Sequence, residues 1–446
     1  MNETRRRWLL GGMCAVLACV LLDETIVAVA LPEMASDLGA TSGDIRWVIS
    51  AYLLALASTV AAAGRLADVV GLRRAIVVGA VIFGAASVLA GAAPSSWWLI
   101  LARVVQGLGA AMLLPASYAM ITSTNPPDRR GRALGYYSLA GSVALAVGPL
   151  AGGALVSLFN WRPIFFVNLP IVLFILIVTW KTAPRRGVSG SDRHIDVAGL
   201  LLLVVGLVSL VLAIMQAPAW GWLQPVTLLL AAAGVVLLVG FSVWQLRASS
   251  PLLELDLFAQ PTFVMGNLMV FFTQFSKSAV IIFGAFYLQD VLGMTALEAG
   301  LALLPAVVLM PLLSVPSGNI TDHLGPRRPG LGALLVMTLA LVWFTAIVNV
   351  DNYWLLVPGL VVWGASVPFL FVTAISAVMS AAPTAKGGQA GGINVTGQWL
   401  GAIFSVAILG SLVVYGEQRY GLMYLVAAGL MGFMTLLAFI WFARKR

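Results

Sequence analysis

The sequence GRLADVVGLRR at residues 64–74 recurs as GNITDHLGPRR at residues 318–328. Glycine, aspartate, glycine and a pair of arginines occupy the same places in both copies. Each copy follows the second of a series of long apolar stretches. The chain is therefore expected to consist of two related halves, and its apolar stretches are the units of its fold.

The composition excludes a water-soluble fold. Of the 446 residues, 61% are hydrophobic and 9% are charged, whereas soluble domains carry roughly 25% charged residues. The apolar runs are about 20 residues long, which is the length of a helix that crosses a bilayer. Continuous apolar runs favour helices over the alternating strands of a barrel. The predicted all-α integral membrane fold has fourteen transmembrane helices, at Trp8–Leu31, Ile45–Ala63, Ala75–Ala93, Trp97–Thr122, Leu134–Leu158, Pro163–Trp180, Val197–Met215, Val226–Leu246, Thr262–Leu288, Leu297–Ser317, Leu331–Val348, Trp354–Met379, Gly392–Val414 and Leu422–Phe442.

The basic residues predict the topology. Lysine and arginine collect in alternate loops, at Arg65, Arg73, Arg74, Arg129, Arg130, Arg132, Lys181, Arg185, Arg186, Arg193, Arg247, Arg327, Arg328 and Lys386, and at the C-terminus. The opposite loops contain only Arg46, Arg162 and Arg419. Because cytoplasmic loops carry the excess of Lys and Arg, both termini are expected in the cytoplasm. This distribution accounts for the net charge of +8 without a nucleic-acid partner.

Residues 1–181 are expected to form an N-terminal six-helix half and residues 251–446 a C-terminal six-helix half. Residues 182–250 contain a linker and two extra transmembrane helices between the halves. The first apolar stretch, Trp8–Leu31, is too long for the apolar core of a secretory signal. The predicted protein is therefore a multi-pass membrane protein with an even number of helices.

The chain resembles the major facilitator superfamily, and within it the fourteen-helix drug:proton antiporter branch. Residues 64–74 look like the superfamily's cytoplasmic loop between the second and third helices. The sequence LDETIVAVALP at residues 22–32 is similar to the first-helix motif of that branch. LARVVQGLG at residues 101–109 resembles its fourth-helix motif, and GPLAGG at residues 148–153 resembles the fifth-helix motif of antiporters. Ala144 stands where the fifth-helix motif has another glycine.

Four ionisable residues fall within apolar stretches, where a charge costs at least about 2.5 to 3.5 kcal/mol at the bilayer centre. They are Asp23 and Glu24 in the first helix, Arg103 in the fourth and Lys277 in the ninth. Asp23 and Arg103 lie at similar depth, so they can form a pair. Low dielectric favours a neutral carboxyl and a nearby guanidinium favours an ionised one, so small rearrangements can change its proton occupancy.

The resemblance implies that Asp23 carries the exchanged proton. The alternative for Asp23 and Arg103 is a static ion pair that positions two helices. Glu24 lies about 100° from Asp23 around the helix. A role in proton coupling and a structural role are both open for Glu24.

Polar residues on other helices form a candidate substrate cavity. Asn267, Gln274 and Lys277 lie on one face of the ninth helix, with Phe271 between them. Lys277 is expected to contact the substrate or to form a salt bridge with an acid of the first helix. The other candidates for this cavity are Gln106, Asn394, Gln398, Tyr52 and Tyr137. For each of these, packing between helices is the alternative.

Two sets of residues are candidates for gating. The first set comprises Gly64, Asp68, Gly71, Arg73 and Arg74, with Asp322 in the second copy. Asp68 can pair with neighbouring arginines and hold the halves closed on the cytoplasmic side, and the glycines permit tight turns. The second set comprises Gly148, Pro149, Gly152 and Gly153. These residues allow close contact between helices and a bend.

The favoured function is proton-coupled export of amphipathic small molecules, or multidrug efflux, by alternating access. Duplicated halves are typical of transporters, and no Walker-type sequence for ATP is present. The expected partners are substrates, protons and lipid, with no cofactor and a monomeric protein. The intramembrane charges sum to zero, which argues against a dedicated exporter of permanent cations and makes neutral, zwitterionic or anionic substrates at least as plausible. The excess of arginine over lysine, with abundant alanine and glycine, fits a GC-rich bacterial genome, and the expected location is the bacterial cytoplasmic membrane.

Other functions are possible alternatives. A dedicated exporter of one endogenous metabolite or antibiotic would have a narrow substrate profile. A membrane enzyme is disfavoured because His194 and His323 lie in loops and no paired nucleophile and base are recognisable. A metal site is not expected, since Cys14 and Cys19 both lie in the first apolar stretch. A sensor would need an appended soluble domain, for which we expect no room.

Overall fold

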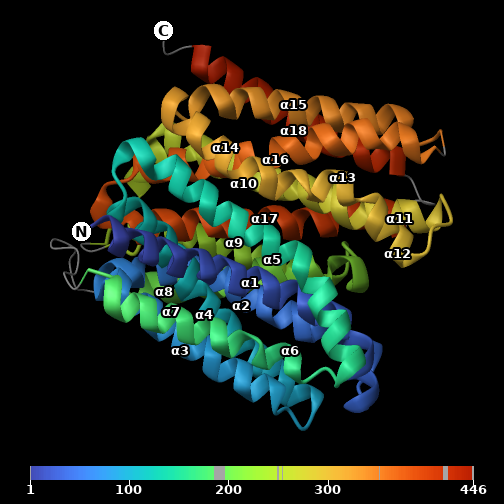
Figure 1. The fold of residues 1–446 in the computed structure, drawn as a ribbon, viewed down its shortest axis with the longest axis horizontal. Coiled ribbons are helices and arrows are strands. Elements are labelled where there is room, and N and C mark those ends of the chain that lie inside the picture. The colour runs from blue at the N-terminus through green and yellow to red at the C-terminus, as the bar shows by residue number, and fades with distance from the viewer. Residues whose placement is uncertain are drawn as a thin grey trace.

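The computed structural model describes residues 2–184, 196–248, 251–253, 255–350, 352–414 and 420–443. These residues form helices and no strand. Fourteen helical segments among them are long and apolar enough to cross a membrane. Figure 1 shows them as one bundle, with the first turn of the chain and its last helix turn at the same end. The predicted fold class and helix number are confirmed.

The first half contains α1 (Glu3–Asp37), α2 (Ser42–Val70), α3 (Leu72–Gly91), α4 (Ser96–Thr124), η1 (Pro127–Arg129), α5 (Arg130–Leu158), α6 (Pro163–Phe166) and α7 (Asn168–Thr182). The two extra helices are α8 (Val197–Trp220) and α9 (Pro225–Gln245). The second half contains η2 (Leu255–Ala259), α10 (Pro261–Lys277), the π-helix η3 (Ser278–Ile282), α11 (Phe283–Asp290), α12 (Ala296–Ala302), α13 (Leu304–Val307), α14 (Leu309–Leu324), α15 (Arg327–Ile347), α16 (Tyr353–Ala381), η4 (Thr384–Lys386), α17 (Gly387–Val414) and α18 (Tyr420–Ala443).

The repeated segment differs from the predicted loop. Helix α2 continues to Val70 and α3 begins at Leu72, so only Gly71 interrupts the helix, at φ +93°. In the second copy, Gly325 has φ +71° between α14 and α15. Glycine adopts positive φ without steric cost. The loop prediction was wrong because backbone hydrogen bonds of the helix extend through the polar residues of the repeat.

The two halves meet most extensively along two pairs of helices, and α4 also packs against α17 and α5 against α16. Helix α2 packs against α17, and α5 packs against α14. We refer to these contacts as the α2–α17 seam and the α5–α14 seam. Within the halves, α1 packs on α5, α2 on α4, and α10 on α16 and α17. The helices of each half thus pack on one another, and α2, α4 and α5 of the first half also pack on helices of the second half.

The two extra helices form a hairpin, because α8 packs against α9. Helix α8 also contacts both α2 and α17, one from each half. The hairpin therefore covers the α2–α17 seam.

The division of the chain into residues 1–181, 182–250 and 251–446 stays a prediction. Several residues used in predicting topology or function lie outside the described residues: Arg185, Arg186, Arg193, His194, Arg419, Arg444, Lys445 and Arg446.

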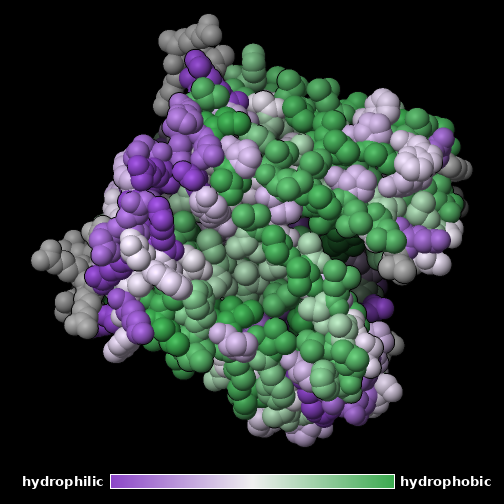
Figure 2. Space-filling model, viewed as in Figure 1, coloured by the Kyte–Doolittle hydropathy of each residue, from purple (hydrophilic) through white to green (hydrophobic). Residues whose placement is uncertain are grey.

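Figure 2 shows apolar side chains over the middle of the molecule and hydrophilic ones gathered toward its two ends. This pattern is what a bilayer requires of a spanning protein. The halves are joined at the end that holds the termini and separated by a hollow at the other end. We refer to these as the closed end and the open end.

Candidate functional site

Asp23 lies on α1 with a fully buried side chain. Its Oδ2 accepts a hydrogen bond from Arg103 Nη1 on α4, with which it forms an ion pair. Its Oδ1 accepts from Gln106 Nε2 and from Asn168 Nδ2, each at 2.7 Å. The carboxylate therefore receives three hydrogen bonds from α4 and α7. The structure brings Asp23, Arg103 and Gln106 together.

Arg103 is held by several groups besides Asp23. Its Nε donates to the Val48 carbonyl at 2.9 Å and its Nη1 to Gln106 Oε1 at 2.6 Å. The guanidinium lies 4.2 Å from the centre of the Tyr52 ring, a cation–π contact. Tyr52, expected in the substrate cavity, instead supports Arg103. Arg103 Nη2 and the Tyr52 hydroxyl have no hydrogen-bond partner among the described residues.

Two further residues complete this network, and the sequence analysis missed both. Ser87 on α3 accepts hydrogen bonds from Gln106 Nε2 at 3.0 Å and Asn168 Nδ2 at 3.3 Å. Its own hydroxyl donates to the Phe83 carbonyl. Asn168 and Ser87 are buried polar residues in apolar helices. The only signal in the sequence was that both side chains are polar. Polar side chains in membrane helices often serve only the contact between helices.

The hydrogen bonds of the Asp23 network do not include Glu24, although the charges of Asp23 and Arg103 act on it. Its side chain is half-buried, as is that of Lys277 on α10. The charges of Glu24 and Lys277 act on each other. Lys277 immediately precedes the π-helix η3, and such helices are frequent at functional sites. The two adjacent acids of α1 therefore have different surroundings: Asp23 faces its own half, and Glu24 interacts with a charge of the other half.

A second chain of polar side chains crosses between the halves. Asn394 Nδ2 donates to Asn267 Oδ1 at 3.4 Å, and Gln398 Nε2 donates to Asn394 Oδ1 at 3.1 Å. Gln398 Nε2 also donates to the Tyr118 hydroxyl at 3.1 Å. Three of these residues were candidates for the substrate cavity, whereas Tyr118 on α4 was missed.

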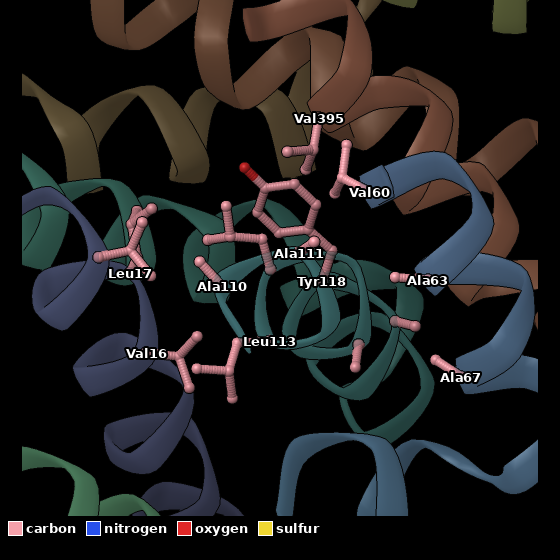
Figure 3. Packing of buried hydrophobic residues seen from close by; sticks show 14 of the residues in the cluster. Val16, Leu17, Val60, Ala63, Ala67, Ala110, Ala111, Leu113, Tyr118 and Val395 are labelled. Atoms are coloured by element: carbon pink, nitrogen blue, oxygen red, sulfur yellow. The ribbon is translucent and has the colours of Figure 1, made fainter. Parts of the chain in front are cut away.

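Tyr118 is surrounded by helices of both halves. Figure 3 shows its ring near Val395 of α17 and Val60 of α2. The ring also packs edge-on against Tyr137 of α5, with centroids 5.1 Å apart. The Tyr137 hydroxyl is 2.8 Å from the Ser117 hydroxyl, and Tyr137 is fully buried. Tyr137 thus packs between helices here.

The other cavity candidates lie on α10. Phe271 is half-buried and packs edge-on against Phe404 of α17, with centroids 5.9 Å apart. Gln274 is half-buried and lies outside the hydrogen-bonded chain that contains Asn267. Asn267, Phe271 and Gln274 therefore have different neighbours, although the sequence places them on one face of the helix.

Asp68 joins the halves at the closed end. Its Oδ1 accepts the backbone N–H of Gly388 and its Oδ2 that of Gln389, both at 2.7 Å. These N–H groups belong to the first turn of α17, where the helix dipole favours an anion. The charge of Arg65 also acts on Asp68. Asp68 therefore caps a helix of the other half, an arrangement that the predicted arginine pairs did not include.

Asp322 makes the corresponding contact at the α5–α14 seam. Its Oδ1 accepts the N–H of Gly131 at 2.6 Å and its Oδ2 that of Arg132 at 2.8 Å, at the start of α5. We refer to these two contacts as the Asp68 cap and the Asp322 cap. Each aspartate of the repeated sequence thus caps a helix of the opposite half.

Backbones meet beside both caps. A Cβ added to Gly64 would collide with the carbonyl oxygen of Gly388, and one added to Gly318 with that of Gly131. Glycine is required at these positions for the close approach. Gly71 provides the turn that follows. The repeat therefore holds one glycine for close contact, one aspartate for capping and one glycine for the turn.

The remaining gating candidates lie in varied places. Arg73 Nη2 donates to the Trp180 carbonyl at 3.0 Å, and its guanidinium lies over the Trp180 ring. Arg74 is exposed. Arg73 therefore ties α3 to α7 within one half.

The fifth-helix glycines pack near the Asp23 network. A Cβ on Gly148 would collide with Thr25, and one on Gly152 would meet Ile26 at 3.0 Å. Pro149 lies inside α5 and is exposed, whereas Gly153 has no atom within 4 Å of an added Cβ. Gly148 and Gly152 therefore allow α5 to approach α1 closely.

Comparison with known proteins identifies the family. The model of the Major Facilitator Superfamily matches residues 13–406 and again residues 266–446. The chain belongs to the major facilitator superfamily. This superfamily member is accordingly a transporter and not an enzyme. Among the described residues, no three of its His, Cys, Asp and Glu side chains are grouped as they would be around a metal ion.

Several superfamily members in bacteria are similar to it. The puromycin resistance protein of Streptomyces alboniger is 35% identical over 427 residues, which are 94% of this chain and 84% of that protein. The tetracenomycin C resistance and export protein of Streptomyces glaucescens is 32% identical, over 88% of this chain and 73% of its own length. The methyl viologen resistance protein of Salmonella typhimurium is 31% identical, with 92% and 83% covered.

Solved structures of the superfamily share the fold. A human organic anion transporter aligns with a TM-score of 0.72 at 13% identity, covering 98% of this chain and all of that one. A proton:xylose symporter gives the same TM-score and identity, with 99% and 96% covered. At such identity these structures support the architecture alone.

Proposed function

We propose that this chain exports amphipathic small molecules across a bacterial cytoplasmic membrane in exchange for protons, as a monomer working by alternating access. The observation that carries the proposal is the Asp23 network, an acid buried at membrane depth with an arginine and two amides around it. The names of the relatives, which cite resistance to or export of small compounds, support the export direction.

Asp23 can couple a proton to helix geometry. When Asp23 is ionised, it binds Arg103, Gln106 and Asn168. A proton on Asp23 removes the charge that Arg103 balances and turns one acceptor into a donor. Arg103 then keeps the Val48 carbonyl and the Tyr52 ring, so it stays in place while α1 becomes free to move relative to α4. Protonation and movement of α1 are thereby linked.

The caps supply the gate in this proposal. With both termini in the cytoplasm, the closed end is the cytoplasmic end, and the described conformation faces outward. Loading a substrate from the cytoplasm requires release of the Asp68 and Asp322 caps. A charge-assisted hydrogen bond contributes about 1.5 to 3 kcal/mol, so four of them can hold one conformation without making it permanent.

Glu24 and Lys277 are proposed as the substrate-facing charges. Their opposite charges leave the region between the halves neutral, which favours neutral or zwitterionic substrates. Asn394 and Gln398, in the hydrogen-bonded chain between Asn267 and Tyr118, add further hydrogen-bonding groups between the halves. A compound with one hydrogen-bonding group and an apolar body fits this chemistry.

A dedicated exporter is the second candidate. The printed names of two relatives each cite one antibiotic, puromycin or tetracenomycin C. A panel of lipophilic compounds of differing charge distinguishes the two functions. Transport of several unrelated compounds supports multidrug export, whereas transport of a single chemical class supports the dedicated exporter.

The test of proton coupling is transport in proteoliposomes with a pH indicator in the lumen. Wild-type protein is expected to move protons when a transported compound is added. Asp23→Asn is expected to abolish this proton movement. Glu24→Gln is expected to change the substrate preference and to leave proton movement intact. Glu33→Gln, on the same helix outside the network, is the control. Intact coupling in Asp23→Asn would move the proton site elsewhere, and transport without any proton movement would refute antiport.

A further inference from the structure

A pocket lies between the extra hairpin and the second half. Its volume is about 360 Å³, and its lining comes from α2, α8, α9, the η2 segment, α10 and α17. Pockets for small molecules begin at roughly 300 Å³. Representative lining residues are Leu207, Phe241, Leu268, Phe271 and Leu400. We refer to this space as the lateral pocket.

The hairpin that forms the outer wall is fixed at both of its ends. At one end, Asp196 accepts hydrogen bonds from Trp244 and Gln245, and Gln245 Oε1 accepts the N–H of Leu253 at 3.2 Å. At the other end, Trp222 Nε1 donates to Ser411 Oγ of α17 at 2.7 Å. The hairpin is therefore attached to the second half near its termini, and the lateral pocket lies between these attachments.

The lining defines the chemistry of a ligand. Among the described residues, three polar side chains line the lateral pocket, Ser242, Asn267 and Thr396, and no charged one does. Ser242 and Thr396 donate to carbonyls of their own helices. Asn267 Nδ2 donates once, to the Phe263 carbonyl, which leaves its second N–H for a ligand. The fitting ligand is neutral, with an apolar body and one hydrogen-bond acceptor.

The pocket faces the bilayer on one side and the closed end on another. Ser242 and Phe258 at its rim are exposed. Ala61 on α2 lies one turn from Gly64, and Ile393 on α17 is five residues from Gly388. The lateral pocket is therefore beside the Asp68 cap, at the depth of the leaflet that adjoins the closed end.

Asn267 also connects the pocket to the interior. It begins the hydrogen-bonded chain that continues through Asn394 and Gln398 to Tyr118. A ligand bonded to Asn267 would thus lie at one end of a row of exchangeable hydrogen-bonding groups. The other end of that row lies between the halves.

We propose that the lateral pocket is a loading site for neutral amphipathic molecules dissolved in the cytoplasmic leaflet. Their apolar body lies between α8, α9, α10 and α17, and their acceptor group bonds Asn267. The assignment of the leaflet rests on the proposed export function, whereas binding in the pocket does not. An acyl chain of a resident phospholipid is the competing occupant.

The test is binding of the neutral fluorophore N-phenyl-1-naphthylamine to purified protein in nanodiscs, measured with Ser242→Trp and Val243→Trp. Both positions are exposed, but only Ser242 lines the pocket. Filling the rim should weaken binding about tenfold or more, since the probe loses apolar contact. Val243→Trp should bind as the wild type does. Equal binding by both variants would overturn the proposal.

A second measurement avoids effects on folding. Ser242→Cys and Val243→Cys are purified and then labelled with a bulky maleimide, with the wild type as the control for Cys14 and Cys19. Label at Ser242→Cys should weaken probe binding, and label at Val243→Cys should not. Unchanged binding after complete labelling would refute the site. Native mass spectrometry showing a phospholipid that is lost in Ser242→Trp, and that the probe cannot displace from the wild type, would also refute it.

Substrate-driven proton movement separates this proposal from the export function. If the probe binds as proposed but no compound drives protons, the lateral pocket stands and antiport fails. If Asp23→Asn abolishes proton movement while Ser242→Trp leaves both binding and transport of the probe unchanged, antiport stands and the loading site fails.

Discussion

The α2–α17 seam and the α5–α14 seam are built from corresponding residues, yet they differ in their surroundings. Both close with an aspartate that caps the opposite helix and with a glycine against a glycine. The α2–α17 seam lies under α8, and Asp68 is 2% exposed. Asp322 is only half-buried. The same contact therefore operates in two different dielectric environments.

The seams also differ one to two turns further into the membrane. The hydroxyl oxygens of Ser138 and Ser314 lie 3.1 Å apart across the α5–α14 seam and share a hydrogen bond. The corresponding places in the α2–α17 seam hold Val395 and Val60, which Figure 3 shows near each other. Both seams therefore keep the same capping chemistry. The α2–α17 seam, which the extra hairpin covers, is the more apolar and the more buried of the two.

Among variants of the two seams, the largest expected effect comes from Asp68→Asn. The variant loses the charge on a buried cap, and hydrogen bonds to charged groups contribute about 1.5 to 3 kcal/mol each. We expect export to fall about tenfold or more, against a smaller fall for the matched Asp322→Asn. Export rates and disulfide trapping across each seam measure the effect. Equal losses in the two variants would show that burial under the hairpin does not matter.

Substitution of the paired glycines should have a somewhat smaller effect. In Gly64→Ala and Gly318→Ala the new methyl group meets a carbonyl oxygen of the other half, and overpacking costs about 1 to 3 kcal/mol. Both variants should open the closed end to a similar degree, because the seams match at this point. Accessibility of introduced cysteines at the closed end is the measurement. Gly153→Ala, with open space around it, should behave as wild type.

The serine pair across the α5–α14 seam offers a finer test. Ser138→Ala should lower the melting temperature by an amount equivalent to about 0.5 to 1.5 kcal/mol. Ser138→Val combined with Ser314→Val should recover part of the loss, because both polar partners are then replaced and the seam becomes like its counterpart. Thermal unfolding in detergent over the full double-mutant cycle measures the coupling. Strict additivity would mean that the two hydroxyls do not interact.

The smallest effect is expected for Trp222→Phe. This change removes the hydrogen bond to Ser411 and leaves an aromatic ring, so the loss is about 1 kcal/mol. Hydrogen exchange in α8 and α9 should rise, with no change at the α5–α14 seam. Trp220→Phe, on the same turn of the hairpin, is the control. Increased exchange at both seams would indicate that the hairpin stabilises the whole molecule.

The sequence predicted the residues of the caps but not their partners. The repeat singled out Gly64, Asp68 and Asp322 because the two copies can be aligned. Their partners Gly388 and Gly131 are 320 and 191 residues away in the respective hydrogen bonds, and a short glycine sequence carries no mark of such a contact. An alignment of Pro126 with Pro383 would have paired these glycines, since both lie five residues later.

Part of the intramembrane site could be predicted from the depth of its residues in the membrane. Asp23 and Arg103 were placed together because their positions along two spanning helices match. Ser87 and Asn168 could not be selected, since single polar residues in apolar helices commonly serve packing. Tyr52 was assigned to the cavity because a sequence does not show on which side of a helix a cation will lie.

The closing contacts at the two seams depend largely on main-chain atoms: N–H groups of Gly388, Gln389, Gly131 and Arg132, and the backbones of paired glycines. Most substitutions leave an N–H group in place, and proline alone removes it. Side chains facing the substrate can therefore change without altering the chemistry that shuts the protein. A transporter closed in this way can evolve toward new compounds and keep its cycle.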